Sequence, residues 1–331
     1  MTRAVRRPAL DVLKGAAIVF VVLNHALVWP MRSGDQASAL LYGTAFWTVA
    51  AYTAVAGWVR GTRVSEPSGA ALARRARQLL TPWVFWAPLY AAAPLVWRLI
   101  GGGELPIGFA PREWFVAVAL GGGPLWFLPV LLVVQAVCEP WVERHDGWAP
   151  ALLGVGAYGA LAALGVARGE GPLALGSGTF WAVAPLYVAA FWCGVRFARR
   201  PASIGQGALA WTAAVTTLAS GAVTYARYAA GGPHWLMWVP YALGLAGGCA
   251  LLALAAGASA APDAGRGLLA RAGRVSLGVY VLHPAFLAPA ELVLHGRGGA
   301  MGALVATALT VVLAVVVAEW ARRRPVLCRV M

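Results

Sequence analysis

Long apolar stretches dominate this chain and limit what it can fold into. Ten of them, each about as long as a membrane-spanning helix, can be marked along the 331 residues. They lie at 12–31, 40–59, 79–100, 124–142, 149–167, 177–197, 208–228, 235–257, 275–294 and 301–321. Only 11% of the residues are charged, against about 25% in soluble domains. The sequence therefore predicts an all-α, polytopic integral membrane protein with about ten transmembrane helices.

The chain is expected to form a single transmembrane domain over residues 1–331, with no appended soluble domain. No period of 20–50 residues repeats, which argues against a solenoid. The first apolar run is full-length and lacks a cleavage site, so no signal peptide is expected. Within 101–123 the apolar piece is too short to span, and we interpret this segment as an outer loop with an interfacial or re-entrant piece.

Basic residues predict the orientation of the chain, because Lys and Arg concentrate in cytoplasmic loops. With the N-terminus inside, 20 of the 26 Lys and Arg residues fall on the cytoplasmic side. We therefore expect a multi-pass protein of the plasma (inner) membrane with both termini cytoplasmic. The net charge of +14 then reflects these loops, and no nucleic-acid partner is expected.

The first apolar run carries three ionisable residues that a plain membrane helix does not need. Asp11 and Lys14 are three residues apart and can form an ion pair. Lys14 and His25 share one helical face within roughly 20°, about 16 Å apart along the axis. A charge at a helix end can reach the interface, but His25 lies inside the span and is a functional candidate. On the residues alone, a histidine bonded to a neighbouring helix remains the alternative.

A second intramembrane histidine follows in the late run 275–294. Ser276, Tyr280 and His283 have the 4 and 3 spacing of one helical face. Pro284 weakens the local helix and can leave a backbone carbonyl free. Counted from the helix starts, His283 lies about 13 Å deep and His25 about 22 Å, so the two are not expected to pair. His283 is expected to support the site, with a bonded core histidine as the alternative.

Two arginines at the start of the third run share a face. Arg74 and Arg77 are three residues apart if this segment is helical, and guanidinium groups bind phosphate in a two-bond fork. The alternative is that they follow the positive-inside rule and contact lipid head groups.

Neither metal nor disulfide chemistry is indicated. Cys138, Cys193 and Cys249 lie in apolar runs without metal-site spacing and are expected to be small buried hydrophobes. No paired carboxylates suggest glycoside hydrolysis.

Five motifs resemble the membrane-bound acyltransferase 3 family. "LDVLKGAAIVFVVLNHA", from Leu10, is similar to the family's first helix, in which a basic residue precedes the essential histidine by eleven positions. Here Lys14 stands where arginine is more usual, and His25 matches the histidine. "AVAGWVRG" at 54–61 resembles the end of the second helix, with Ala56 where serine is usual.

The remaining three motifs follow in the family's order. "ARRARQLLTPW" at 73–83 resembles its basic segment, "PLWFLPVLL" at 124–132 its Leu-Trp-Phe-Leu signature, and "VSLGVYVLHPAFL" at 275–287 its late helix. The resemblance covers most of the chain and implies an integral membrane fold of about ten helices. It implies transfer of an acyl group, often acetyl from acetyl-CoA, to the hydroxyl of a sugar or other acceptor.

The resemblance also assigns roles to residues. A neutral imidazole can accept a proton near pH 7, so His25 is the expected general base, grouped with Lys14 and Asp11 as the catalytic set. Direct attack by the acceptor hydroxyl is the simplest mechanism. The remaining predicted site residues are Arg74 and Arg77 for the phosphates of the donor, and Trp126, Tyr280 and His283 for the substrate. No permanently bound cofactor is expected; acyl-CoA is the donor substrate, and the bilayer is the surrounding partner.

Two other classes stay open. A transporter or flippase for a glycan or small molecule also carries many spans and intramembrane ionisable residues, although an internal repeat is not visible. A non-catalytic scaffold would leave the aligned Lys14 and His25 unexplained.

Overall fold

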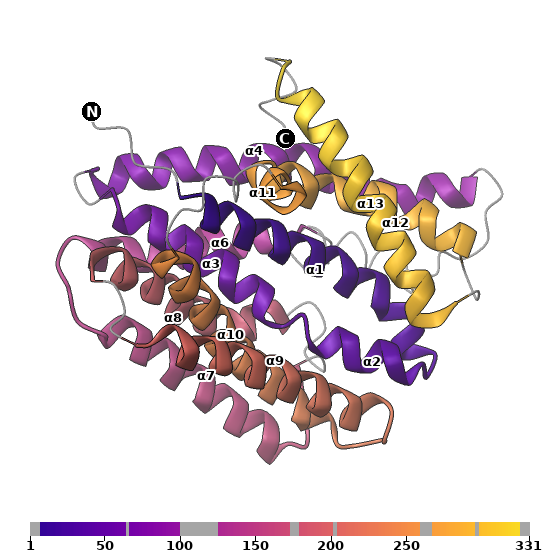
Figure 1. The fold of residues 1–331 in the computed structure, drawn as a ribbon, viewed down its shortest axis with the longest axis horizontal. Coiled ribbons are helices and arrows are strands. Elements are labelled where there is room, and N and C mark those ends of the chain that lie inside the picture. Colours follow the sequence, from indigo (N-terminus) through magenta and orange to yellow (C-terminus); the bar gives the residue numbers. More distant parts are fainter. Residues whose placement is uncertain are drawn as a thin grey trace.

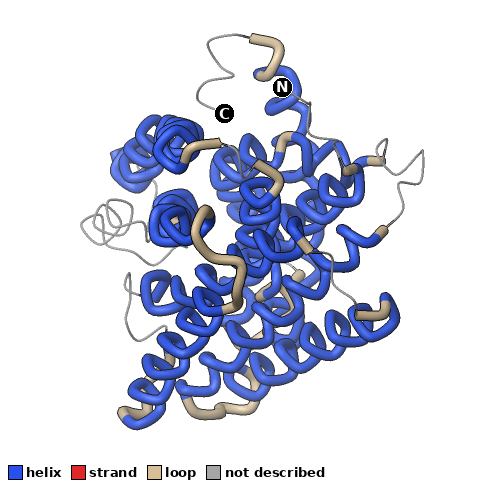
Figure 2. The backbone as a smooth tube through the Cα atoms, turned by 90° about the vertical axis from the view of Figure 1, so that its left-hand side faces the viewer, coloured by secondary structure: helices blue, strands red, loops and turns tan. Residues whose placement is uncertain are grey.

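The computed structural model describes residues 7–63, 66–99, 125–172, 179–200, 204–258, 267–294 and 298–324. Within these ranges the regular structure is entirely helical, and no strand occurs (Figure 2). The predicted piece at 101–123 lies outside the described residues. The helical class is therefore as the apolar runs predict.

The helices follow the predicted apolar runs closely. Their bounds are α1 Pro8–Arg32, α2 Gln36–Gly43, α3 Trp47–Gly61, α4 Ser68–Leu99, α6 Phe127–Val142, α7 Ala149–Ala167, α8 Thr179–Arg199, α9 Gln206–Tyr228, the 3₁₀ turn η2 His234–Met237, α10 Trp238–Gly257, α11 Leu268–Arg274, α12 Ser276–Leu294 and α13 Gly299–Ala321. Six stretches are long and apolar enough to cross a membrane: Pro8–Arg32, Gln36–Gly61, Ala149–Ala167, Trp181–Arg199, His234–Gly257 and Gly299–Ala321. Two shorter apolar helices, Phe127–Val142 and Ser276–Ala290, accompany them. The chain is thus a multi-pass membrane protein, while the number ten is not confirmed.

The run predicted as one helix at 40–59 is broken into α2 and α3. The Asp35 side chain caps α2 by accepting a hydrogen bond from the Ser38 N–H at 3.0 Å. At the other end the Thr44 hydroxyl donates to the Leu41 carbonyl at 2.7 Å. This local bond competes with the helical pattern, and it stands at the point where α2 ends and the chain turns toward α3.

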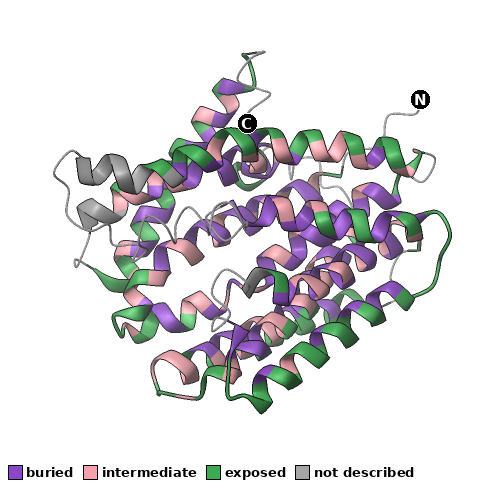
Figure 3. Ribbon diagram, turned by 180° about the vertical axis from the view of Figure 1, so that it is seen from behind, coloured by how far each residue is buried: buried purple, intermediate pink, exposed green. Residues whose placement is uncertain are grey.

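The helices form a layered bundle in which α4 runs along one edge, α7 along the opposite edge, and α1 and α3 between them (Figure 1). Buried residues concentrate toward the middle of the bundle, and exposed ones lie along the outer helices (Figure 3). Helices α3 and α8 pack closely because Gly57 and Gly194 meet backbone: a Cβ at either would lie 1.9 Å from a carbonyl oxygen of the facing helix. Small residues allow such close packing in membranes.

Helix ends predicted to share one side of the membrane do meet. At the end predicted to be cytoplasmic, the contacts are Arg60 with Glu139, Ser68 with Glu143, and Arg271 with Glu319. At the opposite end they are Asp35 with Ala300 and Gln36 with Tyr225. This agrees with the predicted alternation of the helices.

Candidate active site

The start of α1 forms a small polar cluster. The Asp11 and Lys14 side chains make the predicted ion pair, with Oδ1 2.9 Å from Nζ. The Tyr52 hydroxyl, from α3, donates to the Lys14 carbonyl at 2.7 Å. Helix α11 lies directly against this turn, since a Cβ on Gly273 would stand 1.8 Å from the Asp11 carbonyl oxygen. The cluster therefore joins α1, α3 and α11.

Further along α1, His25 lies beside His283 of α12. The centroids of the two rings are 5.0 Å apart, and the ring planes are tilted by 34°. The prediction that these residues lie at different depths is wrong. It assumes that the two helix starts are level, but the chain just before α12 already lies beside the second turn of α1: a Cβ on Gly273 would stand 1.8 Å from the Asp11 carbonyl oxygen and 2.9 Å from the Gly15 nitrogen. The two rings are therefore adjacent inside the bundle.

The two imidazoles differ in exposure and bonding. His25 is half-buried, and no hydrogen bond joins its ring to another described residue. His283 is only 1% exposed, and its Nδ1 lies 2.6 Å from the Tyr280 carbonyl oxygen. In a regular helix the N–H of residue 284 would donate to the Tyr280 carbonyl. Residue 284 is proline, which has no N–H, so this carbonyl has no helical donor. The carbonyl that Pro284 was predicted to leave free is therefore that of Tyr280, and it is hydrogen-bonded by the His283 ring.

Tyr280 and the Leu-Trp-Phe-Leu signature meet in the same region. Helix α6 begins at Phe127 without a side-chain cap, and its Phe127 N–H donates to the Tyr280 hydroxyl at 3.2 Å. The Tyr280 and Phe127 rings are 6.1 Å apart. Trp126 precedes them and packs near Tyr187 of α8, with 6.2 Å between ring centroids. Because the tyrosine oxygen accepts this bond, its proton remains available for donation.

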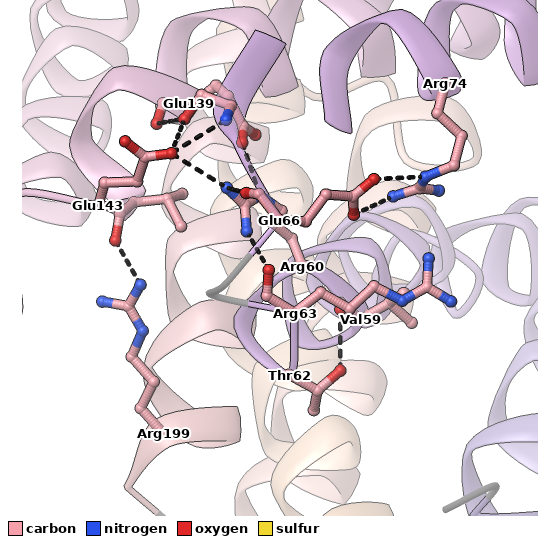
Figure 4. Close-up of polar contacts among 11 residues, drawn as sticks. Val59, Arg60, Thr62, Arg63, Glu66, Arg74, Glu139, Glu143 and Arg199 are labelled. Carbon is pink, nitrogen blue, oxygen red and sulfur yellow. Dashed lines mark hydrogen bonds and ion pairs between the residues drawn. The ribbon is translucent and has the colours of Figure 1, made fainter. Parts of the chain in front are cut away.

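The two predicted donor arginines have different surroundings, and Figure 4 shows those of Arg74. Arg74 forms a two-bond fork with Glu66: Nε lies 2.9 Å from Oε1, and Nη2 lies 2.8 Å from Oε2. These bonds hold the pKa of Glu66 below its usual range. Arg77 is exposed, and no ion pair joins it to the described residues. Among the described residues Arg77 is thus unpaired, whereas a ligand at Arg74 would have to displace Glu66.

The loop that carries Glu66 is fixed by Arg60 (Figure 4). The Arg60 Nε lies 2.6 Å from a Glu139 carboxylate oxygen, and both side chains are 6% exposed. The other nitrogens of Arg60 donate to the carbonyls of Arg63, at 2.6 Å, and Glu66, at 3.1 Å. A buried arginine thus joins α3, α6 and the loop before α4.

Several residues that contact the predicted site residues were not predicted from the sequence. Tyr52 stood within an apolar run, and Phe127 within the signature, but neither showed what it would contact. Glu66 and Glu139 carried the clearest overlooked signal, because acidic residues are scarce here: 12 Asp and Glu in 331 residues. Among the described residues, no three His, Cys, Asp or Glu side chains are grouped as a metal site would need.

Fold and site together define a multi-pass helical membrane protein with a histidine pair inside the bundle and arginines at one end. The model of the acyltransferase 3 domain, described as an acyltransferase domain, matches residues 7–319, nearly the whole chain. The chain belongs to the acyltransferase 3 family, and its class is membrane acyltransferase. No curated protein and no solved structure matches the chain significantly.

Proposed function

We propose that the protein transfers an acyl group, most simply acetyl, from acyl-CoA to a hydroxyl of a carbohydrate or other acceptor. His25 is the general base in this reaction. The acceptor oxygen attacks the thioester carbonyl, its proton passes to His25, the C–S bond breaks, and the thiolate leaves as the CoA thiol once it is protonated. Donor and acceptor are substrates, so no resident cofactor is required.

The observation that carries the proposal is the burial and the hydrogen bonding of the His25 ring, in a chain that belongs to this family. Its ring lies inside the bundle, is half-buried, and is not held by a hydrogen bond from the described residues. A ring nitrogen is therefore available to a substrate, as a general base requires.

Neighbouring groups support a substrate site. The Tyr280 hydroxyl accepts the Phe127 N–H, so its own proton can be donated to a substrate oxygen such as the thioester carbonyl. Trp126 is 9% exposed and offers an aromatic wall beside it. In this proposal Tyr280 and Trp126 contact the substrate.

The donor is proposed to enter from the end that bears the arginines. Arg77, with Arg74 once Glu66 releases it, would hold the phosphates in charge-assisted hydrogen bonds. Lys14 and His25 are about 16 Å apart along α1, so the Asp11–Lys14 pair belongs to this entrance and does not reach the reacting atoms. The pantetheine arm would carry the acyl group from the entrance to His25.

This arrangement agrees with a cytoplasmic entrance for the donor, because CoA is found inside the cell. We therefore keep both termini and the loop before α4 on the cytoplasmic side of the plasma membrane. The contacts between Arg60 and Glu139 and between Ser68 and Glu143 support the grouping of these helix ends.

The experiment is transfer by the purified protein from radiolabelled acyl-CoA donors to a panel of hydroxylated acceptors. The proposal expects a labelled acceptor and saturable CoA binding. The alternative, a transporter or flippase, is favoured by substrate movement across vesicles without CoA binding or labelled product.

A further inference from the structure

Pro284 leaves the Tyr280 carbonyl of α12 without its helical donor, and the His283 ring forms a hydrogen bond with this carbonyl. The Tyr280 carbonyl oxygen lies 2.6 Å from Nδ1 of His283. A carbonyl oxygen can only accept a hydrogen bond, so Nδ1 must carry the proton. The neutral His283 ring is therefore in the tautomer that leaves Nε2 with a bare lone pair.

That Nε2 atom is a buried acceptor without a partner. The His283 side chain is fully enclosed, and Nε2 has no hydrogen-bond partner in the described part of the chain. Buried polar atoms are nearly always bonded, and an exception needs a physical explanation. The ring of His25 is adjacent, 5.0 Å between centroids, and about 5 Å is also the spacing given by one N–H···N bond between two imidazoles.

We propose that His283 is a positioning residue for His25, an inference that rests on the proposed function. Its Nε2 accepts an N–H from one ring nitrogen of His25, so the other nitrogen of His25 keeps its lone pair toward the acceptor hydroxyl. When His25 takes the hydroxyl proton, the imidazolium that forms remains hydrogen-bonded to His283. The order of groups is Tyr280 carbonyl, His283, His25, acceptor.

The exposure of the two rings agrees with these separate roles. His25 is half-buried, whereas His283 is enclosed, so a substrate can reach the first ring and not the second. The contact closes by a turn of the His25 ring, and catalytic hydrogen bonds are commonly long before substrate binds. A base oriented by a third group is a recurrent arrangement in acyl-transfer enzymes.

Two substitutions of His283 separate positioning from packing. In His283→Gln the side-chain oxygen can stand near the Nε2 position and accept from His25, while the bond to the Tyr280 carbonyl is lost. In His283→Asn the amide can keep a donor to Tyr280, while the acceptor toward His25 is lost. We expect His283→Asn to lower kcat about tenfold or more, with donor and acceptor KM changed less than about threefold. We expect His283→Gln to retain more of the parental kcat than His283→Asn.

The opposite order, or parental kcat in both variants, overturns the proposal and leaves His283 as a packing residue. If neither variant folds, nitrogen-15 NMR of the parent labelled at its 5 histidines still decides. A proton on Nδ1 of His283 is expected, and a proton on Nε2 alone contradicts the proposal. His25→Gln in the same assay separates the two claims: parental activity there defeats the proposed function, whereas an inactive His25→Gln with a parental His283→Asn defeats only this inference.

Discussion

Glu66 occupies the guanidinium fork of Arg74, with bonds of 2.9 and 2.8 Å (Figure 4). A phosphate group would use the same fork, so in the proposed function the carboxylate and the donor would compete for Arg74. The pKa of Glu66 is lowered by Arg74, which keeps the carboxylate ionised at neutral pH. The contribution of this pair to stability is present above the ordinary pKa of Glu66 and is lost as the pH falls through the lowered one.

Glu66→Gln is therefore expected to lower the donor KM. The pair is partly exposed, with side chains 33% and 24% accessible, and exposed pairs are worth up to about 1 kcal/mol. The expected fall in donor KM is about two- to fivefold, with the acceptor KM unchanged, in steady-state kinetics. An unchanged donor KM would mean that Arg74 binds only Glu66 or lipid.

Arg77→Gln is expected to raise the donor KM, because no carboxylate in the described part of the chain pairs with Arg77 first. Losing one charge-assisted contact costs about 1.5–3 kcal/mol, or about ten- to a hundredfold. The double variant of Arg74 and Arg77 should lose more than either single one. Arg144→Gln, an exposed arginine of another loop, is the matched control and should keep the parental value. Equal losses in Arg77→Gln and Arg144→Gln would indicate a general charge effect.

Glu139→Ala is expected to destabilise the protein strongly, because it leaves the buried guanidinium of Arg60 with only the longer, 4.0 Å contact to the exposed carboxylate of Glu143. Breaking a buried pair from one side costs about 3–5 kcal/mol. Thermal unfolding in detergent should show a clearly lower midpoint. Glu143→Ala provides the control on the same helix end, since the Glu143 side chain is 46% exposed and should matter much less. Similar midpoints in both variants would contradict a structural role for the Arg60–Glu139 pair.

The orientation is tested by cysteine labelling in whole cells, after replacement of the four native cysteines. Ser68→Cys, at the start of α4, is expected to resist an impermeant reagent applied outside and to react after the cells are opened. Ser33→Cys, exposed between α1 and α2, should react from outside. Labelling at position 68 in intact cells would reverse the predicted orientation.

Local features of the fold could be predicted from the sequence, because they depend on spacing within one helix. The Asp11–Lys14 pair and the carbonyl freed by Pro284 are of this kind, and both follow from helical geometry. The apolar runs likewise mark the helices well.

Contacts between helices could not be predicted in this way. The approach of His25 to His283 depends on where α12 begins. Helix α11, which precedes it, packs against the first turns of α1 and so fixes that starting point. The fork between Glu66 and Arg74 depends on a loop fixed by Arg60 from α3. Helical spacing says nothing of either relationship, because each is set by packing between segments far apart in the chain.

The role of His25 is tested most directly by His25→Gln, assayed for acyl transfer at matched membrane levels. Glutamine keeps approximate size and hydrogen bonding but cannot take a proton at neutral pH. A positioned base is worth about 10²–10⁴-fold in rate, so transfer should fall to background while insertion and abundance stay normal, as in His25→Ala. His234→Gln is the control and should retain parental activity. His234 contacts Arg227 and lies at the end of the bundle away from Arg74 and Arg77. Near-parental transfer by His25→Gln would contradict the account, because the imidazole would then serve only to hold helices together.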